Sequence, residues 1–140
     1  MPYEFLEHMA DVYVKAYGKN LEEVFESAAE ALFEVMINTK SVELKEEHEL
    51  SVEGVDLHQL LYNWLEALLI LLTSQGFAVG KVSILELKRN GQCYLRAKVY
   101  GEPYSAKKHE ARVEVKSPTY SLMEIQEKEG FAEARFVLDI

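Results

Sequence analysis

Apolar residues recur at helical spacing in one long segment, DLHQLLYNWLEALLILLTS, which runs from Asp56 to Ser74. The first half of this segment keeps a narrow polar stripe, whereas residues 67–72 are apolar on every side. Asp56 is a favourable N-cap, and Gly76 follows as a helix stop. Because a helix without a polar face must be covered on most sides, the pattern predicts the central helix of the core, with β-sheet packed on it.

Three further elements are predicted before this helix. Apolar and polar residues alternate over 12–17, which predicts a half-buried strand that ends at Gly18. A helix follows, with Asn20 as its N-cap and an apolar stripe that extends to Met36. Residues 42–53 alternate loosely and predict another strand. The polar side of the first helix carries glutamates at i,i+4 spacing, which are predicted to form a solvated face: Glu22, Glu26, Glu30 and Glu34.

From Phe77 onward the sequence is typical of short strands and turns, and Asn90-Gly91 favours a β-hairpin. Strands are predicted at residues 82–87, 93–100, 111–115, 120–126 and 131–138. Regular alternation makes Cys93 a small core residue. Helices interleaved with strands early, and hairpins late, predict an α+β fold. We expect one domain over residues 1–140, with two helices packed on a mostly antiparallel β-sheet layer.

Composition narrows the classes of function. The chain is 49% hydrophobic and 28% charged, as expected for an ordinary globular protein, and its formal net charge is −9. That charge argues against strong unaided binding of nucleic acid and favours a basic partner protein or cations. The single cysteine indicates a reducing compartment. Neither a signal peptide nor a membrane-spanning helix is expected, so the predicted location is the cytoplasm.

The common catalytic motifs are missing from the sequence: it has no P-loop, GxGxxG, HExxH, GxSxG or paired cysteines. No nucleophile with an obvious base can be named, and three places remain where chemistry could occur. The first precedes the strand at 12–17 and contains His8 and Asp11. Either these side chains are solvated or capping groups, or they take part in a site.

The second place is the end of the sequence, where an apolar strand runs to Asp139-Ile140. The Asp139 side chain and the α-carboxylate of Ile140 are then neighbours. One interpretation is an edge strand that simply stops. In the other, two adjacent anions joined by a third carboxylate form an oxygen site for Ca²⁺ or Mg²⁺, since like charges held this close repel without a cation. Spacing alone does not identify Asp11 as the third.

The third place is the one basic cluster of an acidic chain: Lys107, Lys108 and His109, with Arg112 and Lys116 following. Lysines in a predicted turn are either solvated or protect a sheet edge from pairing. The alternative is a contact point for an acidic or phosphate-bearing group.

Taken in order, several short motifs resemble those of the archease family. They are His8-x-Ala10-Asp11-Val12, Gly18 with the helix after it, Asp56-Leu57-x-x-Leu60-Leu61, Gly101-Glu102 with His109, Glu114-Val115-Lys116-x-x-Thr119-Tyr120 and the final Leu138-Asp139-Ile140. The similarity covers essentially the full length. It implies a small cytoplasmic protein, not itself an enzyme, that assists the RtcB-type RNA ligase of tRNA splicing. In that family the protein promotes guanylylation of the ligase by GTP and restores it between turnovers, with a divalent metal present. The family is also connected with assistance to a tRNA methyltransferase.

By position, the resemblance implies that Asp11 and Asp139 bind the metal and that Ile140 adds its terminal oxygen. It also implies that Lys116 is important for activation, and His8 is a candidate for orienting Asp11. Two residues depart from the family pattern. Met9 stands where the family often has Thr, and Ser117-Pro118 replaces a small-plus-apolar pair. Because Pro118 has no N–H, the strand there must be an edge, bulged or broken.

The leading hypothesis is therefore a metal-binding activator of an RNA ligase that uses Ca²⁺ or Mg²⁺. Two other classes of protein remain open. One is a free-standing metal-dependent phosphoesterase that uses the same carboxylates. The other is a metal-free chaperone or interaction module for a tRNA-modifying enzyme.

Overall fold

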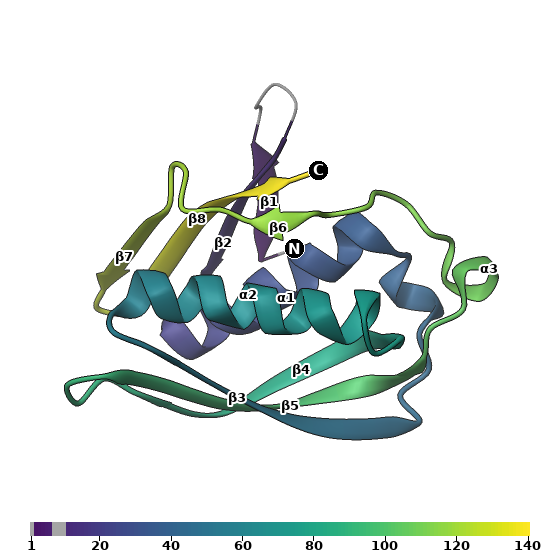
Figure 1. Cartoon of the computed structure of the whole chain (residues 1–140). Coiled ribbons are helices and arrows are strands. Elements are labelled where there is room, and N and C mark those ends of the chain that lie inside the picture. Colours follow the sequence, from purple (N-terminus) through teal and green to yellow (C-terminus); the bar gives the residue numbers. More distant parts are fainter. Residues whose placement is uncertain (1, 7–10) are drawn as a thin grey trace.

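Two long helices lie between two antiparallel β-sheets in the computed structural model, which describes residues 2–6 and 11–140 (Figure 1). The predicted α+β class is confirmed. The antiparallel strands expected beside the helices form two sheets, one on each side of the helix pair. The helices need this arrangement because an apolar surface that extends around a helix cannot be buried by one layer.

The central helix α2, Leu57–Thr73, forms where the leucine pattern predicts it. The Asp56 carboxylate caps it by accepting a hydrogen bond of 2.8 Å from the Gln59 N–H. Its Trp64 is fully buried and donates its indole N–H to the carbonyl of Phe25 in the other helix, at 3.0 Å. This bond satisfies a buried polar group and ties the two helices together.

Helix α1, Leu21–Met36, is capped by Asn20, whose side chain accepts from the Glu23 N–H. The solvated glutamate face predicted for it is only partly correct. Glu26 accepts a hydrogen bond from the Ile84 N–H, and Glu34 contacts Thr39 and Arg112. These two carboxylates bind groups of other segments.

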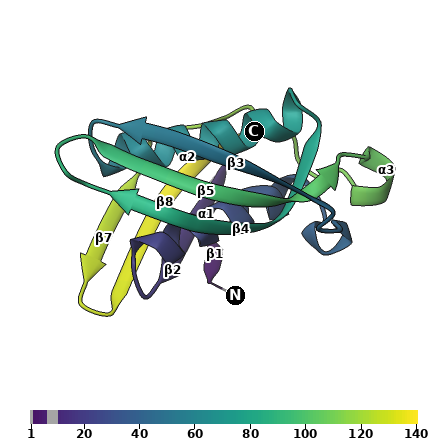
Figure 2. The ribbon, with the colours of Figure 1, turned by 90° about the horizontal axis from the view of Figure 1, so that it is seen from below.

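The three-stranded sheet has the order β3-β5-β4 and covers one side of the helices (Figure 2). Its strands are β3 (Glu46–Gly54), β4 (Phe77–Lys88) and β5 (Cys93–Pro103). The β4–β5 pair is the predicted hairpin, with Gly91 at a φ of 77°, and Cys93 is buried as predicted. Strand β3 starts at Glu46, later than predicted, and a short 3₁₀ helix, Thr39–Ser41, lies before residues 42–45, which belong to neither element.

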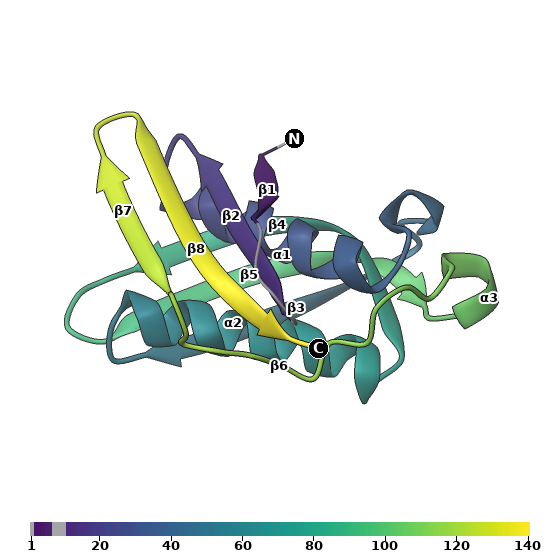
Figure 3. The same ribbon diagram turned by 90° about the horizontal axis from the view of Figure 1, so that it is seen from above.

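The other sheet has the order β1-β2-β8-β6, with β7 also paired to β8 (Figure 3). Its strands are β1 (Tyr3–Leu6), β2 (Val12–Gly18), β6 (Ser117–Pro118), β7 (Glu124–Lys128) and β8 (Phe131–Asp139). The final strand is therefore an interior strand with neighbours on both sides, which corrects its interpretation as an edge. Pro118 lies in a two-residue strand, in keeping with its missing N–H.

The strand predicted at 111–115 is wrong. A short helix α3, Ala106–His109, comes before this segment, and the segment itself lies against the end of α1. The N–H groups of Arg112 and Val113 donate to the carbonyls of Met36 and Val35. Carbonyls in the last turn of a helix have no partner within the helix, so the segment pairs with them and not with a strand.

No helix in the part of the chain that the structure describes is both long enough and apolar enough to cross a membrane.

Strands β4 and β5 approach each other so closely at Gly101 that a side chain there would clash. A Cβ at this position would lie 1.8 Å from the carbonyl oxygen of Ala78 in β4. Because backbone cannot yield as a side-chain tip can, Gly101→Ala is expected to lower the free energy of unfolding by about 3 kcal/mol, measured by urea denaturation. Gly91→Ala is the control: its Cβ meets open space, and its positive φ costs only about 1 kcal/mol. Equal losses for the two variants would contradict this steric account.

Candidate metal and activation corner

The register of β2 against β8 brings the two predicted metal-binding aspartates to the same end of the sheet. Val12 pairs with Leu138 at the last position of the antiparallel ladder. Asp11 immediately precedes the first of these residues, and Asp139 immediately follows the second. Figure 3 shows the start of β2 beside the end of β8. We call this end of the sheet the carboxylate corner.

Strand β6 brings Lys116 to the same corner. Ser117 pairs with Asp139, and the Lys116 N–H donates to the Asp139 carbonyl at 2.7 Å. Val115 beside it is buried, whereas Lys116 itself is exposed. The backbone of Lys116 is thus fixed against the aspartate, and its ammonium group can extend into solvent or towards a partner.

A hollow of about 450 Å³ opens beside the first of the two aspartates. Its lining comprises Phe5, Leu6, Asp11, Val12, Tyr13, Glu34, Val35, Arg112 and Val113. Apolar side chains on this lining are unusually accessible, with Phe5 50% and Val113 40% exposed. The hollow therefore combines a carboxylate with apolar contact area.

The donor groups at the carboxylate corner are oxygens, which suit Ca²⁺ and Mg²⁺ better than soft metals. Across residues 2–6 and 11–140, no three Asp, Glu, His or Cys side chains are grouped so that they could hold a metal ion. A cation held by Asp11 and Asp139 would thus need further oxygens, and the α-carboxylate of Ile140 is the nearest one along the chain. Ile140 is 36% exposed. The predicted residue His8 and the family departure at Met9 lie outside the described residues.

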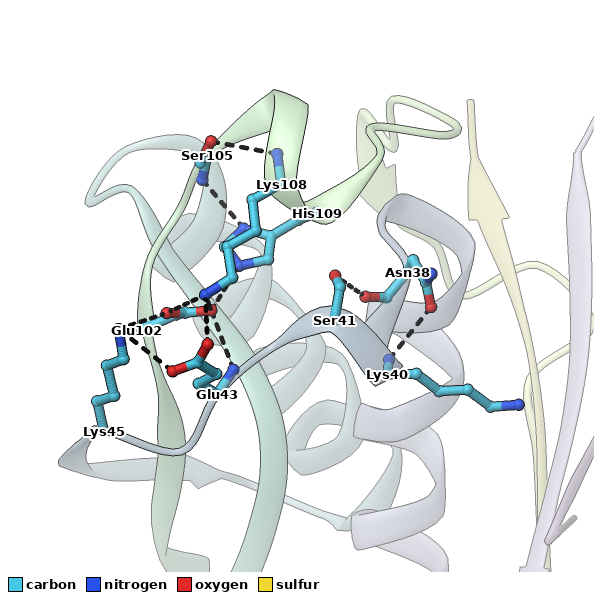
Figure 4. Close-up of polar contacts among 9 residues, drawn as sticks. All are labelled: Asn38, Lys40, Ser41, Glu43, Lys45, Glu102, Ser105, Lys108 and His109. Carbon is cyan, nitrogen blue, oxygen red and sulfur yellow. Dashed lines mark hydrogen bonds and ion pairs between the residues drawn. The ribbon is translucent and has the colours of Figure 1, made fainter.

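Three members of the predicted basic cluster, Lys108, His109 and Arg112, contact carboxylates. Two of them share Glu102, which is not among the predicted site residues. Glu102, at the end of β5, is buried and is surrounded by donors (Figure 4). It accepts from the Glu43 N–H at 3.0 Å, from Lys108 at 2.9 Å and from the ring of His109 at 2.8 Å. Lys45 lies 3.7 Å away. Lys108 is thus in part a structural residue and not simply a solvated one.

His109 is fully buried, and its hydrogen bonds determine which ring nitrogen carries the proton. Its Nδ1 accepts a hydrogen bond of 3.0 Å from the Ser105 N–H, so the ring proton lies on Nε2 and is donated to Glu102. Its carbonyl accepts from the Asn38 N–H at 2.8 Å. The residue therefore connects α3, the end of β5 and the segment that follows α1. In the sequence, the only signal that joined Glu102 to His109 was the archease-like motif that contains both residues.

These contacts fix the charge of Glu102. The hydrogen bonds from the Glu43 N–H, from His109 and from Lys108 stabilise the carboxylate, and they lower its pKa from 4.5 to about 2, although burial opposes the change. Each of these donors loses its anionic partner if Glu102 is protonated.

Arg112 fixes the next part of the same segment. Its guanidinium donates to both the carbonyl and the carboxylate of Glu34 in α1. Burial acts to raise the pKa of Glu34, but the hydrogen bonds from Thr39 and Arg112 outweigh it and leave that pKa lowered. The chain that leads to Lys116 is thus attached to α1 before it reaches the carboxylate corner.

The fold and the corner together define a small α+β protein whose distinctive feature is an oxygen-rich sheet end with a lysine beside it. The model of the Archease protein family matches residues 3–140. The chain belongs to the archease family.

Several relatives extend over the whole chain. It is 43% identical to the archease of Sulfurisphaera tokodaii and 44% identical to that of Sulfolobus acidocaldarius, each over 99% of this chain and 98% of the relative. The solution structure of protein 1598 from Methanobacterium thermoautotrophicum is similar at a TM-score of 0.81 and 37% identity, over 99% of both chains. A Thermotoga maritima crystal structure, described as an archease and possible chaperone, shares the fold at a TM-score of 0.60 and 21% identity, over 98% of this chain and 96% of that one.

The lowered pKa of Glu102 predicts a pH-dependent contribution to stability. The folded state favours the carboxylate, so its stabilising effect is complete above about pH 4.5 and is lost as pH falls towards about 2. Glu102→Gln should therefore be less stable than wild type near neutral pH, and the difference in free energy of unfolding should shrink between these limits. Thermal unfolding across that range measures it.

Glu43→Gln is the matched control. It removes an exposed carboxylate that also pairs with Lys108, and it keeps the Glu43 N–H that donates to Glu102. Its effect near neutral pH should be the smaller of the two. If the stability difference between Glu102→Gln and wild type stays constant from pH 7 to pH 2.5, Glu102 is not held as an anion by the fold.

Proposed function

We propose that this protein activates an RtcB-type RNA ligase in the cytoplasm, promoting GTP-dependent guanylylation of the ligase and its multiple turnover. Membership of the archease family supports an accessory, chaperone-like protein, and the description of the Thermotoga maritima relative as a possible chaperone agrees with this role. The ligase as partner follows from the family resemblance. Assistance to a tRNA methyltransferase is the alternative partner role.

The observation that supports this proposal best is the convergence of three separate segments at the carboxylate corner. Asp11 comes from the start of β2, Asp139 from the end of β8, and Lys116 from the residue before β6. In the sequence these residues lie far apart, and each carries a charged group that packing of the core does not require. Charged side chains gathered at one sheet end, next to accessible apolar area, suit contact with another macromolecule.

We further propose that Asp11, Asp139 and the α-carboxylate of Ile140 hold Ca²⁺ or Mg²⁺. Such an ion, when bound, would supply positive charge that can stabilise a phosphate group in the partner's active site. The chain's own residues would hold it at the contact surface. Lys116 would place a second positive charge nearby, and the acidic surface as a whole would favour a basic, nucleic-acid-handling partner.

The test is multiple-turnover RNA ligation by the purified ligase, with and without this protein. We expect many turnovers only when the protein is present. Lys116→Ala should reduce this activation at least tenfold while melting temperature and metal affinity stay unchanged, because the side chain is exposed and only its backbone N–H binds Asp139.

Lys107→Ala is the matched control, since it removes an exposed lysine from the same region without touching the corner. It should activate like wild type. Full activation by Lys116→Ala would remove this residue from the proposed role. Hydrolysis of phosphoesters by the protein alone, with no ligase present, would instead identify a free-standing metal-dependent phosphoesterase.

Metal binding can be tested separately through the end of the chain. Adding Ca²⁺ or Mg²⁺ at 100 times the dissociation constant should stabilise the protein by about 2.7 kcal/mol, seen as a higher melting temperature. A C-terminal tag converts the Ile140 α-carboxylate to an amide and should weaken this effect, whereas an N-terminal tag should not. Equal metal affinity of the two tagged forms would exclude the α-carboxylate, and no stabilisation of the untagged protein would favour a metal-free interaction module.

A further inference from the structure

The exposed side of α2 carries a second surface that the carboxylate corner does not use. Tyr62, Glu66 and Ile70 follow one another at i,i+4 spacing and form the stripe of the helix that the sheets leave uncovered. The connection between β6 and β7 passes over α2 (Figure 3), and both strands contact this helix. Tyr120, in the turn within that connection, stacks on Tyr62, with ring centroids 4.5 Å apart and planes 9° from parallel. Because Tyr120 is still 51% exposed, the stack presents an aromatic face to solvent.

The same turn holds a leucine in an unfavourable backbone conformation. Leu122 has a φ of 56°, in the left-handed region that suits Gly or Asn and disfavours residues with a bulky side chain. Its side chain is 51% exposed, so burial in the core does little to offset the strain. The turn itself is closed by a hydrogen bond from the Met123 N–H to the Tyr120 carbonyl, which any residue at 122 permits. Strain kept at an exposed apolar residue points to a contact outside this chain.

The charges around the aromatic pair indicate the chemistry of that contact. Burial, Tyr62, and the carboxylates of Asp56 and Glu66 all act to raise the pKa of Tyr120. Glu66 also lies one helical turn after Tyr62 on the same exposed stripe, so a carboxylate borders the aromatic face. A guanidinium or ammonium group is attracted by both the ring faces and the carboxylates, whereas a phosphate is repelled by the carboxylates. This contrast favours a basic protein segment and disfavours nucleic acid.

We propose that Tyr62, Glu66, Tyr120 and Leu122 form a docking surface for an arginine- or lysine-bearing segment of a partner protein. We call it the aromatic surface. Its identification with the ligase rests on the proposed function. In this arrangement a cationic side chain packs on the Tyr62–Tyr120 stack beside Glu66, and Leu122 contacts the apolar part of the same segment.

The aromatic surface and the carboxylate corner are joined by a short, rigid connection. Just after β6, Thr119 donates both its N–H and its hydroxyl to the carbonyl of Val137 in β8, at 3.1 and 3.0 Å. Lys116, just before β6, is bonded to Asp139 of the same strand. These bonds hold the chain between the two surfaces against β8.

The experiment measures the affinity of the purified RtcB-type ligase for the full-length protein by calorimetry, together with the melting temperature of each variant. Leu122→Gly should bind about tenfold more weakly yet melt no lower than wild type, because glycine relieves the positive φ. The matched control is Leu44→Gly, which removes a 53% exposed leucine next to the other sheet and should bind like wild type. Tyr120→Ala should also bind about tenfold more weakly.

The charge can be tested with two variants that change the net charge equally. Glu66→Lys should weaken ligase binding and reduce its dependence on salt, whereas Glu22→Lys, in the first turn of α1, should do neither. A lower melting temperature for Leu122→Gly would show that the leucine side chain stabilises the fold, against the proposal. Unchanged ligase affinity in all three variants, Leu122→Gly, Tyr120→Ala and Glu66→Lys, would overturn the docking surface and leave the proposed function intact. If wild type itself shows no affinity for the ligase, the proposed function fails, and with it the identification of the ligase as the partner at this surface.

Discussion

The antiparallel pairing of β2 with β8 is the interaction on which the other features of the molecule depend. It joins segments near the two ends of the described chain, and the loop that it closes contains nearly all the rest. Closing so long a loop has an entropic cost that burial of the layers in between must offset. Val14 and Phe136 are partners in this ladder, and both are completely buried against the helices. Since side chains alternate along a strand, a slip of one residue would turn this buried set towards solvent. Burial of the core thus fixes the register, and the register alone decides that Asp11 and Asp139 leave the sheet at the same end.

The second constraint is the apolar surface of α2, which explains why the protein has two sheets. The three-stranded sheet covers one side of this helix, and α1 and the other sheet cover most of what remains. What stays accessible is the narrow stripe that contains Tyr62 and Glu66. The turn around Tyr120 reduces this stripe further through the ring stack. The exposed surface of α2 is therefore what remains after the core has been covered, and it borders the strand that leads to the carboxylate corner.

Local signals in the sequence predict the parts of this fold whose partners are close along the chain. Asp56 caps α2 through a residue three positions away, and Gly91 completes a hairpin between adjacent strands. The segment after α3 could not be predicted in this way because its partners are distant in the sequence. The Arg112 N–H donates to the end of α1, and the residue pattern around Arg112 contains no sign of that helix terminus. Glu102 was missed for the same reason, since its donors come from three segments. The corner is an intermediate case. The resemblance to the archease family names the residues, but only the strand register shows that Asp11 and Asp139 leave the sheet together.

Under the proposed function, the protein can shift its partner towards the active state only as far as it binds that state more tightly than the others. Such an effect requires charged groups in defined positions, because mobile groups would adapt to either state and distinguish neither. The segment that carries Lys116 meets this requirement. It is attached on one side through His109 and Arg112, and on the other through Asp139. The buried Glu102 network, although it lies away from the corner, therefore serves the same end: it removes the freedom of the chain that presents the lysine.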